Sequence, residues 1–125
     1  MTTRQQQFAA AAFNRVNGVL QIPDFDKDRY GSIAHRLPVL IRSAGLAQAL
    51  AYVEARGKSE GERLLDDLAS VVGYTNRVNL LTQARTSQLL EYMHLTDQCL
   101  DALLWFKRFA QTVLDVDAAS ENNND

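Results

Sequence analysis

The sequence has a single cysteine, Cys99, so it allows neither an intrachain disulfide nor a zinc site built from several thiolates. No apolar run approaches the roughly 18 residues of a membrane-spanning helix. The first residues, Met1 to Gln7, lack the apolar stretch of a signal peptide. The sequence therefore predicts a cytoplasmic protein that has no membrane partner.

Catalytic signatures are also missing. There is no glycine-rich phosphate loop, no nucleophile elbow and no paired-histidine metal helix. Cys99 and His94 lie five residues apart, about 140° around a helix, so they do not face each other. Cys99 is expected to be a small buried apolar residue. These absences predict a protein that is not an enzyme and holds no metal and no cofactor.

Two histidines leave alternatives open. Glu91 and His94 form the Glu-x-x-His pattern of di-metal helix bundles, but such a site needs a second pattern and two further glutamates. A helical-bundle enzyme with a metal is therefore only a minor alternative, and His94 is expected at the surface. His35 is expected on a solvated helix face, with a role as general base as the alternative.

The charge is distributed unevenly along the chain. The net charge is −2, from 13 basic and 15 acidic residues. Four acidic residues, Asp115, Asp117, Glu121 and Asp125, lie in the last eleven positions, which leaves 13 basic against 11 acidic in residues 1–114. This mild excess falls short of a dedicated nucleic-acid domain, whose pI exceeds about 9. Any nucleic-acid contact is therefore expected to be local, or shared with other subunits.

Helix signals recur along the chain and strand signals do not. Apolar residues at i, i+3, i+4 and i+7 predict an all-α fold, a single compact bundle of about five to six helices with a long C-terminal helix. The expected helices run from a cap at Thr2 or Thr3 to Leu20, from Tyr30 to Ser43, from Leu46 to Gly57, from Ser59 to Gly73, from Asn76 to Arg85 and from Ser87 to Leu114. The helical domain should cover residues 1–116, and the acidic, Asn-rich residues 117–125 should be disordered.

Several helix boundaries carry specific expectations. Asp26 should cap the second helix, a capping box should open the fourth at Ser59–Glu62, and Thr86 or Ser87 should cap the last. Pro38 should kink or break the second helix near Ala34 to Leu37. The apolar stripe of the last helix is wider than the ~100° of a one-sided helix, so neighbours should pack on more than one side of it.

Basic residues alternate with aromatic ones near the end of the last helix. Lys107 and Arg108 lie beside Trp105, Phe106 and Phe109. Such interleaving can hold a phosphate backbone or stack bases. Aromatic residues at this spacing are more often core residues, and a basic pair near a helix C-terminus is more often a match to the helix dipole.

The main alternative function is a small helical DNA-binding transcription regulator. Ser59 to Arg85 can be arranged as a helix-turn-helix, with Asn76, Arg77 and Asn79 near the start of a recognition helix. This hypothesis predicts sequence-selective duplex binding.

Two segments resemble a known family. The first segment runs from Tyr30 to Tyr52; it begins Tyr30-Gly-Ser-Ile-Ala-His-Arg-Leu-Pro38 and continues through Arg42, Gly45 and Leu50. The second segment begins with Tyr92-x-x-x-Thr96 and continues from Cys99 to Ala110, where it contains Trp105-Phe-Lys-Arg-Phe. Their order and spacing are similar to the small helical subunit of type III-B CRISPR effectors, the Cmr complex. The sequence departs from the family pattern at Met93 and Gln98, where an Arg and a Glu are common.

The resemblance implies a non-catalytic subunit that stacks into a short filament against the backbone subunits and helps to bind guide RNA and target RNA. It implies Lys107 and Arg108 as RNA-facing residues, with Arg36, Arg42 and Arg15 as weaker candidates. It also implies structural roles for five further residues, namely Tyr30, Leu37, Pro38, Leu50 and Trp105.

Overall fold

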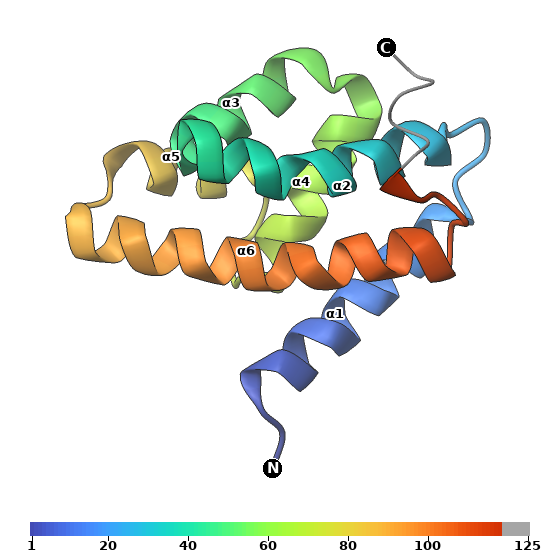
Figure 1. Cartoon of the computed structure of the whole chain (residues 1–125), viewed down its shortest axis with the longest axis horizontal. Coiled ribbons are helices and arrows are strands. Elements are labelled where there is room, and N and C mark those ends of the chain that lie inside the picture. Colours follow the sequence, from blue (N-terminus) through green and yellow to red (C-terminus); the bar gives the residue numbers. More distant parts are fainter. Residues whose placement is uncertain (119–125) are drawn as a thin grey trace.

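The computed structural model describes residues 1–118 and shows six α-helices in that range, with no strand (Figure 1). The helices are α1 (Arg4–Val19), α2 (Lys27–Ala44), α3 (Leu46–Arg56), α4 (Lys58–Val71), α5 (Arg77–Thr86) and α6 (Leu89–Thr112). The predicted all-α fold with a long C-terminal helix is confirmed. Most of the predicted disordered tail, residues 119–125, lies outside the described residues.

Three helices begin with a polar side-chain cap, and two of these caps, Thr3 and Asp26, were predicted. Thr3 caps α1 in a full capping box with Gln6, Asp26 accepts from the Arg29 amide at 3.0 Å, and Asn76 accepts from the Asn79 amide at 3.0 Å. In each case a side-chain oxygen binds an amide that has no partner within the helix.

Two cap predictions are wrong. Helix α4 begins one residue after Gly57, and Ser59 donates to Glu60 at 3.1 Å, so the Ser59–Glu62 capping box does not form. The tight turn at Gly57 places Ser59 already inside the helix, where its hydroxyl cannot reach a free amide. Helix α6 begins after Gln88 without a side-chain cap, because Ser87 already ends α5.

Helix α2 continues through Pro38 without interruption, so of the predicted kink or break near Ala34 to Leu37, the break does not occur. A proline removes one hydrogen bond of a helix, and here Pro38 is buried. Gly45 ends α2 with a φ of +89°, a conformation that glycine adopts without strain. Because α3 starts at Leu46, α2 and α3 form a tight helical hairpin.

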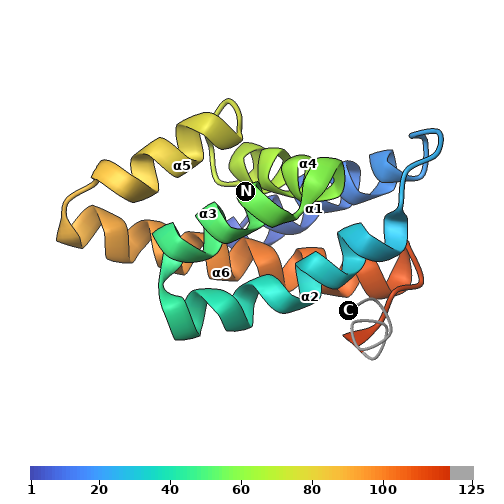
Figure 2. The same ribbon diagram turned by 90° about the horizontal axis from the view of Figure 1, so that it is seen from above.

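Helix α6 is the long element on which the others pack. It runs antiparallel to α2, crosses α1 and also contacts α4 (Figures 1 and 2). Its buried residues are Leu95, Cys99, Ala102, Leu103, Phe106 and Ala110. The expectation of packing on more than one side is confirmed. However, Leu89, Leu90 and Met93, also part of the predicted apolar stripe, are exposed.

A buried polar network joins three helices. The Tyr30 hydroxyl of α2 donates to Asp67 Oδ2 of α4 at 2.7 Å, and Arg63 Nε donates to the same oxygen at 2.9 Å. Arg15 of α1 lies 3.7 Å from Asp67 Oδ1 and donates to Ser70 Oγ at 2.7 Å. Burial raises the pKa of Asp67, and the hydrogen bonds from Tyr30 and Arg63 act against this rise. The charged carboxylate therefore depends on these donors.

The segment after α6 folds back onto α2. Val116 is fully buried, and its amide donates to Ala110 O at 2.8 Å. A Cβ atom at Gly31 would lie 2.7 Å from Val116 Cβ, so only glycine leaves room for this contact. His35 Nε2 lies 2.9 Å from Val116 O, and His35 is only 4% exposed. The predicted solvated position of His35 is wrong, because the returning segment covers the histidine.

The Tyr30–Asp67 bond leads to a stability prediction. Tyr30→Phe should lower the free energy of unfolding by about 1–2 kcal/mol, because it deprives a buried carboxylate of a donor. The measurement is urea denaturation followed by circular dichroism. Tyr52→Phe, at a position that is 45% exposed, is the matched control and should change stability by less than about 0.5 kcal/mol. Equal effects of the two variants would contradict the role given to the network.

Cys99 leads to a reactivity prediction. The thiol is buried, and burial raises its pKa to about 12. Because the thiolate is the reactive species, a thiol reagent at mildly alkaline pH should modify the native protein only as fast as the protein opens. Rapid stoichiometric modification without denaturant would show that Cys99 is accessible.

Candidate nucleic-acid interface

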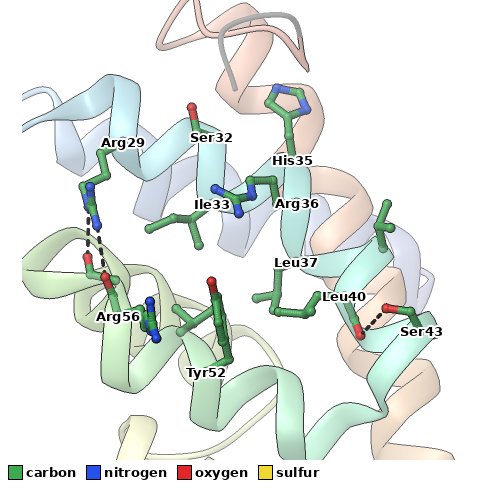
Figure 3. A pocket seen from close by; sticks show the side chains of 13 residues that line it. Arg29, Ser32, Ile33, His35, Arg36, Leu37, Leu40, Ser43, Tyr52 and Arg56 are labelled. Carbon is green, nitrogen blue, oxygen red and sulfur yellow. Dashed lines mark hydrogen bonds between the residues drawn. The ribbon is translucent and has the colours of Figure 1, made fainter. Parts of the chain in front are cut away.

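A groove of about 590 Å³ lies between α2 and α3 (Figure 3). Its lining residues are Arg29, Ser32, Ile33, His35, Arg36, Leu37, Val39, Leu40, Ser43, Tyr52, Val53, Arg56 and Gly57. The lining thus combines an apolar floor with three arginines and three hydroxyl groups, and it contains no acidic residue. This composition suits an anionic ligand with some apolar character.

Arg29 lies at one end of the groove and binds the C-terminal end of α3. It donates from Nη2 to Arg56 O at 3.0 Å and from Nε to Gly57 O at 3.4 Å, the two bonds drawn in Figure 3. The Arg56 carbonyl lies at the C-terminal end of α3, where a cation also matches the helix dipole. The Gly57 carbonyl also accepts from the Gly61 amide of α4 at 2.8 Å. Arg29 Nε also lies 3.8 Å from Glu60 Oε1, which offsets part of its charge.

Arg36 and Tyr52 point toward one another across the groove from α2 and α3 (Figure 3). On the same face of α3, the Arg56 guanidinium lies 5.7 Å from the centre of the Tyr52 ring. A cation over an aromatic face is attracted by the ring and has less freedom. One wall of the groove, on α3, therefore carries the Arg56 guanidinium held against the Tyr52 ring. The other wall, on α2, carries the Arg36 guanidinium.

The five predicted RNA-facing residues do not form one patch. Arg36 lines the groove, and Arg42 is exposed at the C-terminal end of the same helix. On α6, Lys107 is half-buried and Arg108 exposed; as sequence neighbours they project about 100° apart. Within residues 1–118, the side chains of Arg42, Lys107 and Arg108 form no ion pair. The fifth residue, Arg15, contacts Asp67 and Ser70 of α4.

The aromatic residues around Lys107 and Arg108 pack within the protein. Trp105 Nε1 donates to Gln5 Oε1 at 2.8 Å and stacks on Phe109, with 5.9 Å between ring centres. Phe109 meets Phe13 of α1 edge to face, and Phe106 is fully buried. The rings of Trp105 and Phe109 are half-buried and pack against the core, and they join α1 to α6, so the interpretation as a core residue is confirmed for Phe106. The burial of Tyr30, Leu37, Pro38 and Leu50 agrees with their expected structural roles.

Three residues of the groove, Arg29, Tyr52 and Arg56, were not among the predicted site residues. Tyr52 and Arg56 are four positions apart, a spacing that places two residues on one helix face. That signal was available in the sequence. The position of α3 beside α2 was not, because it depends on the turn at Gly45 and on Arg29 reaching across to α3.

The helix-turn-helix alternative is not favoured by the surroundings of α5. Asn76 is used as a cap, and Arg77 lies 2.9 Å from Glu54, 3.1 Å from Asp66 and 3.6 Å from Glu62. Burial acts to lower the pKa of Arg77, but the three carboxylates together outweigh it, so this pKa is raised and the charge is offset. Arg77 thus fastens α5 to α3 and α4, and the start of α5 presents a net acidic surface.

The alternative of a helical-bundle enzyme with a metal needs a group of metal ligands. Among residues 1–118, no three His, Cys, Asp or Glu side chains lie close enough to share an ion. Glu91 and His94 are both exposed. Across the same range, no helix is long and apolar enough to span a membrane.

Comparisons with known proteins identify the family. The family model described as "CRISPR-associated protein (Cas_Cmr5)" matches residues 4–113. The CRISPR system Cmr subunit Cmr5 of Thermus thermophilus is 43% identical over 115 residues, which cover 92% of this chain and 99% of the relative. A crystal structure of a CRISPR-associated Cmr5 family protein from Thermus thermophilus superposes with a TM-score of 0.85 at 43% identity, over 91% of this chain and 99% of that one. The chain belongs to the Cas_Cmr5 family of CRISPR-associated proteins.

Proposed function

We propose that this protein is a non-catalytic small subunit of a type III-B CRISPR effector, the Cmr complex, and acts in the cytoplasm. The observation that carries the proposal is the family match over residues 4–113, with 43% identity to a Cmr subunit over nearly the full length of that subunit. Its partners are the backbone subunits, further copies of itself, and the guide and target RNA.

The exposed apolar residues at the start of α6 support a role in assembly. Leu89 is 70% exposed and Leu90 is 79% exposed, with Met93 one turn further along the helix. Large apolar side chains gathered on a surface are typical of a protein contact. In a filament this surface meets a neighbouring subunit.

The α2–α3 groove supports contact with RNA. Arg36 and Arg56 occupy opposite walls of a groove without a lining carboxylate, and Tyr52 offers a ring for stacking. Lys107, Arg108 and Arg42 provide further cations on the surface, and Arg15 contributes least because α4 already binds it. Each contact is weak alone, but contacts repeated along a filament add up through effective concentration.

Purification of the tagged protein under gentle conditions from its native host tests the assignment to an effector. We expect large subunits and a bound guide RNA to co-purify, identified by mass spectrometry and RNA sequencing. The Leu90→Glu variant should lose these partners while keeping its helicity, because a charge in an apolar interface opposes association. A wild-type protein that purifies alone would contradict the proposal.

Salt dependence tests the groove. For single-stranded RNA, the slope of log K against log salt falls by about 0.7 for each phosphate contact that is lost. Arg36→Gln combined with Arg56→Gln should therefore reduce the slope for an oligouridylate by about 1.4.

Lys107→Ala with Arg108→Ala should weaken RNA retention in the assembled complex without loss of helicity.

Arg85→Gln is the matched control for the groove variant, because Arg85 is an exposed arginine on α5, outside the groove. It should leave the slope unchanged. An equal reduction in the control and the groove variant would mean that the groove has no special part in RNA binding.

A further inference from the structure

The start of α6 presents an apolar surface that the rest of the described chain leaves uncovered. Leu89, Leu90 and Met93, here called the α6 patch, are all exposed. A cleft of about 340 Å³ between α5 and α6 opens beside Leu90, with Tyr74 and Leu95 on its walls. The cleft gives an incoming apolar side chain a place to enter. Such a surface is typical of a contact with another molecule.

A second apolar surface lies on the outer face of α1. Phe13 is 44% exposed, and Leu20, which follows α1 in a helical backbone conformation, is 46% exposed. Because these residues are seven positions apart, about two helical turns, they share one face. Phe13 also meets the half-buried Phe109 of α6 edge to face, with 5.4 Å between ring centres. The three residues Phe13, Leu20 and Phe109 are here called the α1 patch.

The two patches lie at opposite ends of α6. Phe109 is 20 positions beyond Leu89, which corresponds to about 30 Å at the helical rise of 1.5 Å per residue. Figure 1 shows α1 crossing the half of α6 away from its start. One chain therefore cannot bring its α1 patch onto its own α6 patch.

The charges beside the two patches have opposite signs. Residues 89–106 of α6 contain no lysine or arginine. Glu91 and Asp97, on the same turns as the α6 patch, are exposed and have no ion-pair partner among residues 1–118. Arg108, directly before Phe109 of the α1 patch, is exposed and has no ion-pair partner in the same range. Each patch thus joins apolar residues to a charge that complements the charge beside the other patch.

We propose that the α1 patch of one copy docks on the α6 patch of the next, with Arg108 facing Glu91 and Asp97 of its neighbour. Two different surfaces meet, so the contact is head-to-tail and repeats from copy to copy, where a two-fold contact would stop at a pair. The proposal rests on the proposed function for the identity of the partner, a further copy of this chain. It leaves RNA the α2–α3 groove and Lys107, which projects about 100° away from Arg108.

Two complementary variants of the full chain test the docking. Leu90→Glu blocks the α6 patch and Leu20→Glu blocks the α1 patch. Sedimentation equilibrium at concentrations up to about 1 mM should show wild-type association beyond a dimer. Each variant alone should associate at least about tenfold more weakly. An equimolar mixture should form one-to-one dimers and nothing larger, because each variant keeps the patch that the other has lost.

The matched control is Val39→Glu, at an exposed apolar residue of α2 outside both patches, which should associate like the wild type. Circular dichroism checks that each variant keeps its helices, and Phe13→Glu should repeat the result of Leu20→Glu. A wild-type chain that is monomeric throughout, or a mixture that stays monomeric, would overturn the proposal. Association that Leu90→Glu abolishes and Leu20→Glu leaves intact would mean that the α6 patch pairs with itself, which also overturns it.

Charge exchange tests the part given to Arg108. Arg108→Glu should weaken association by about two- to fivefold, the range of an exposed ion pair, and should regain it when mixed with a Glu91→Arg, Asp97→Arg variant. Arg42→Glu makes the same change of charge at an exposed residue of α2 and should leave association unchanged. Equal losses in Arg42→Glu and Arg108→Glu would show that only net charge matters and would overturn the proposed pairing.

Co-purification from the native host separates this proposal from the proposed function. If the chain self-associates as the complementary variants predict but purifies without effector subunits and RNA, the effector assignment is contradicted and the docking stays supported. If effector subunits co-purify with a chain whose self-association ignores both patches, the docking is overturned and the assignment stands.

Discussion

The buried carboxylate of Asp67 is the constraint on which the arrangement of the helices depends. A charge in an apolar interior is costly unless donors surround it. Here the donors come from Tyr30 on α2 and Arg63 on α4, while the guanidinium of Arg15 on α1 lies near the other carboxylate oxygen. A shift of α2 relative to α4 would leave the carboxylate without one of its donors. The network thus favours one packing of these helices over others with a similar apolar content.

The geometry of the groove follows from that packing. Tyr30 fixes the start of α2, and Arg29, one residue earlier, reaches the carbonyls at the end of α3. At the other end of the hairpin, the left-handed turn at Gly45 joins α2 directly to α3. Because both ends are held, the walls that carry Arg36 and Tyr52 face each other at a set separation. A preformed site of this kind spends little free energy on ordering when a ligand binds.

The sequence was a good guide to local structure and a poorer guide to the site. Periodicity predicted the helices, and Thr3 and Asp26 act as the predicted caps, because both signals operate within a few residues. The predicted capping box at Ser59 failed because a tight turn at Gly57 started the helix earlier. His35 became buried through Val116, which is 81 positions away.

Of the three groove arginines, only Arg36 was predicted, since Arg29 and Arg56 meet it through tertiary packing. The resemblance carried by Tyr30–Tyr52 and Tyr92–Ala110 identified the family, and the overall match later confirmed it.

In this account, the small subunit adds shape and charge to an assembly in which base pairing of the guide reads the sequence of the target. Ultraviolet crosslinking of RNA to the assembled effector, followed by peptide mass spectrometry, tests the central claim most directly. The account predicts crosslinked peptides of this subunit from α2 and α3, around Arg36 and Tyr52. Crosslinks confined to α5, or an RNA-bound assembly without crosslinks to α2 and α3, would contradict it.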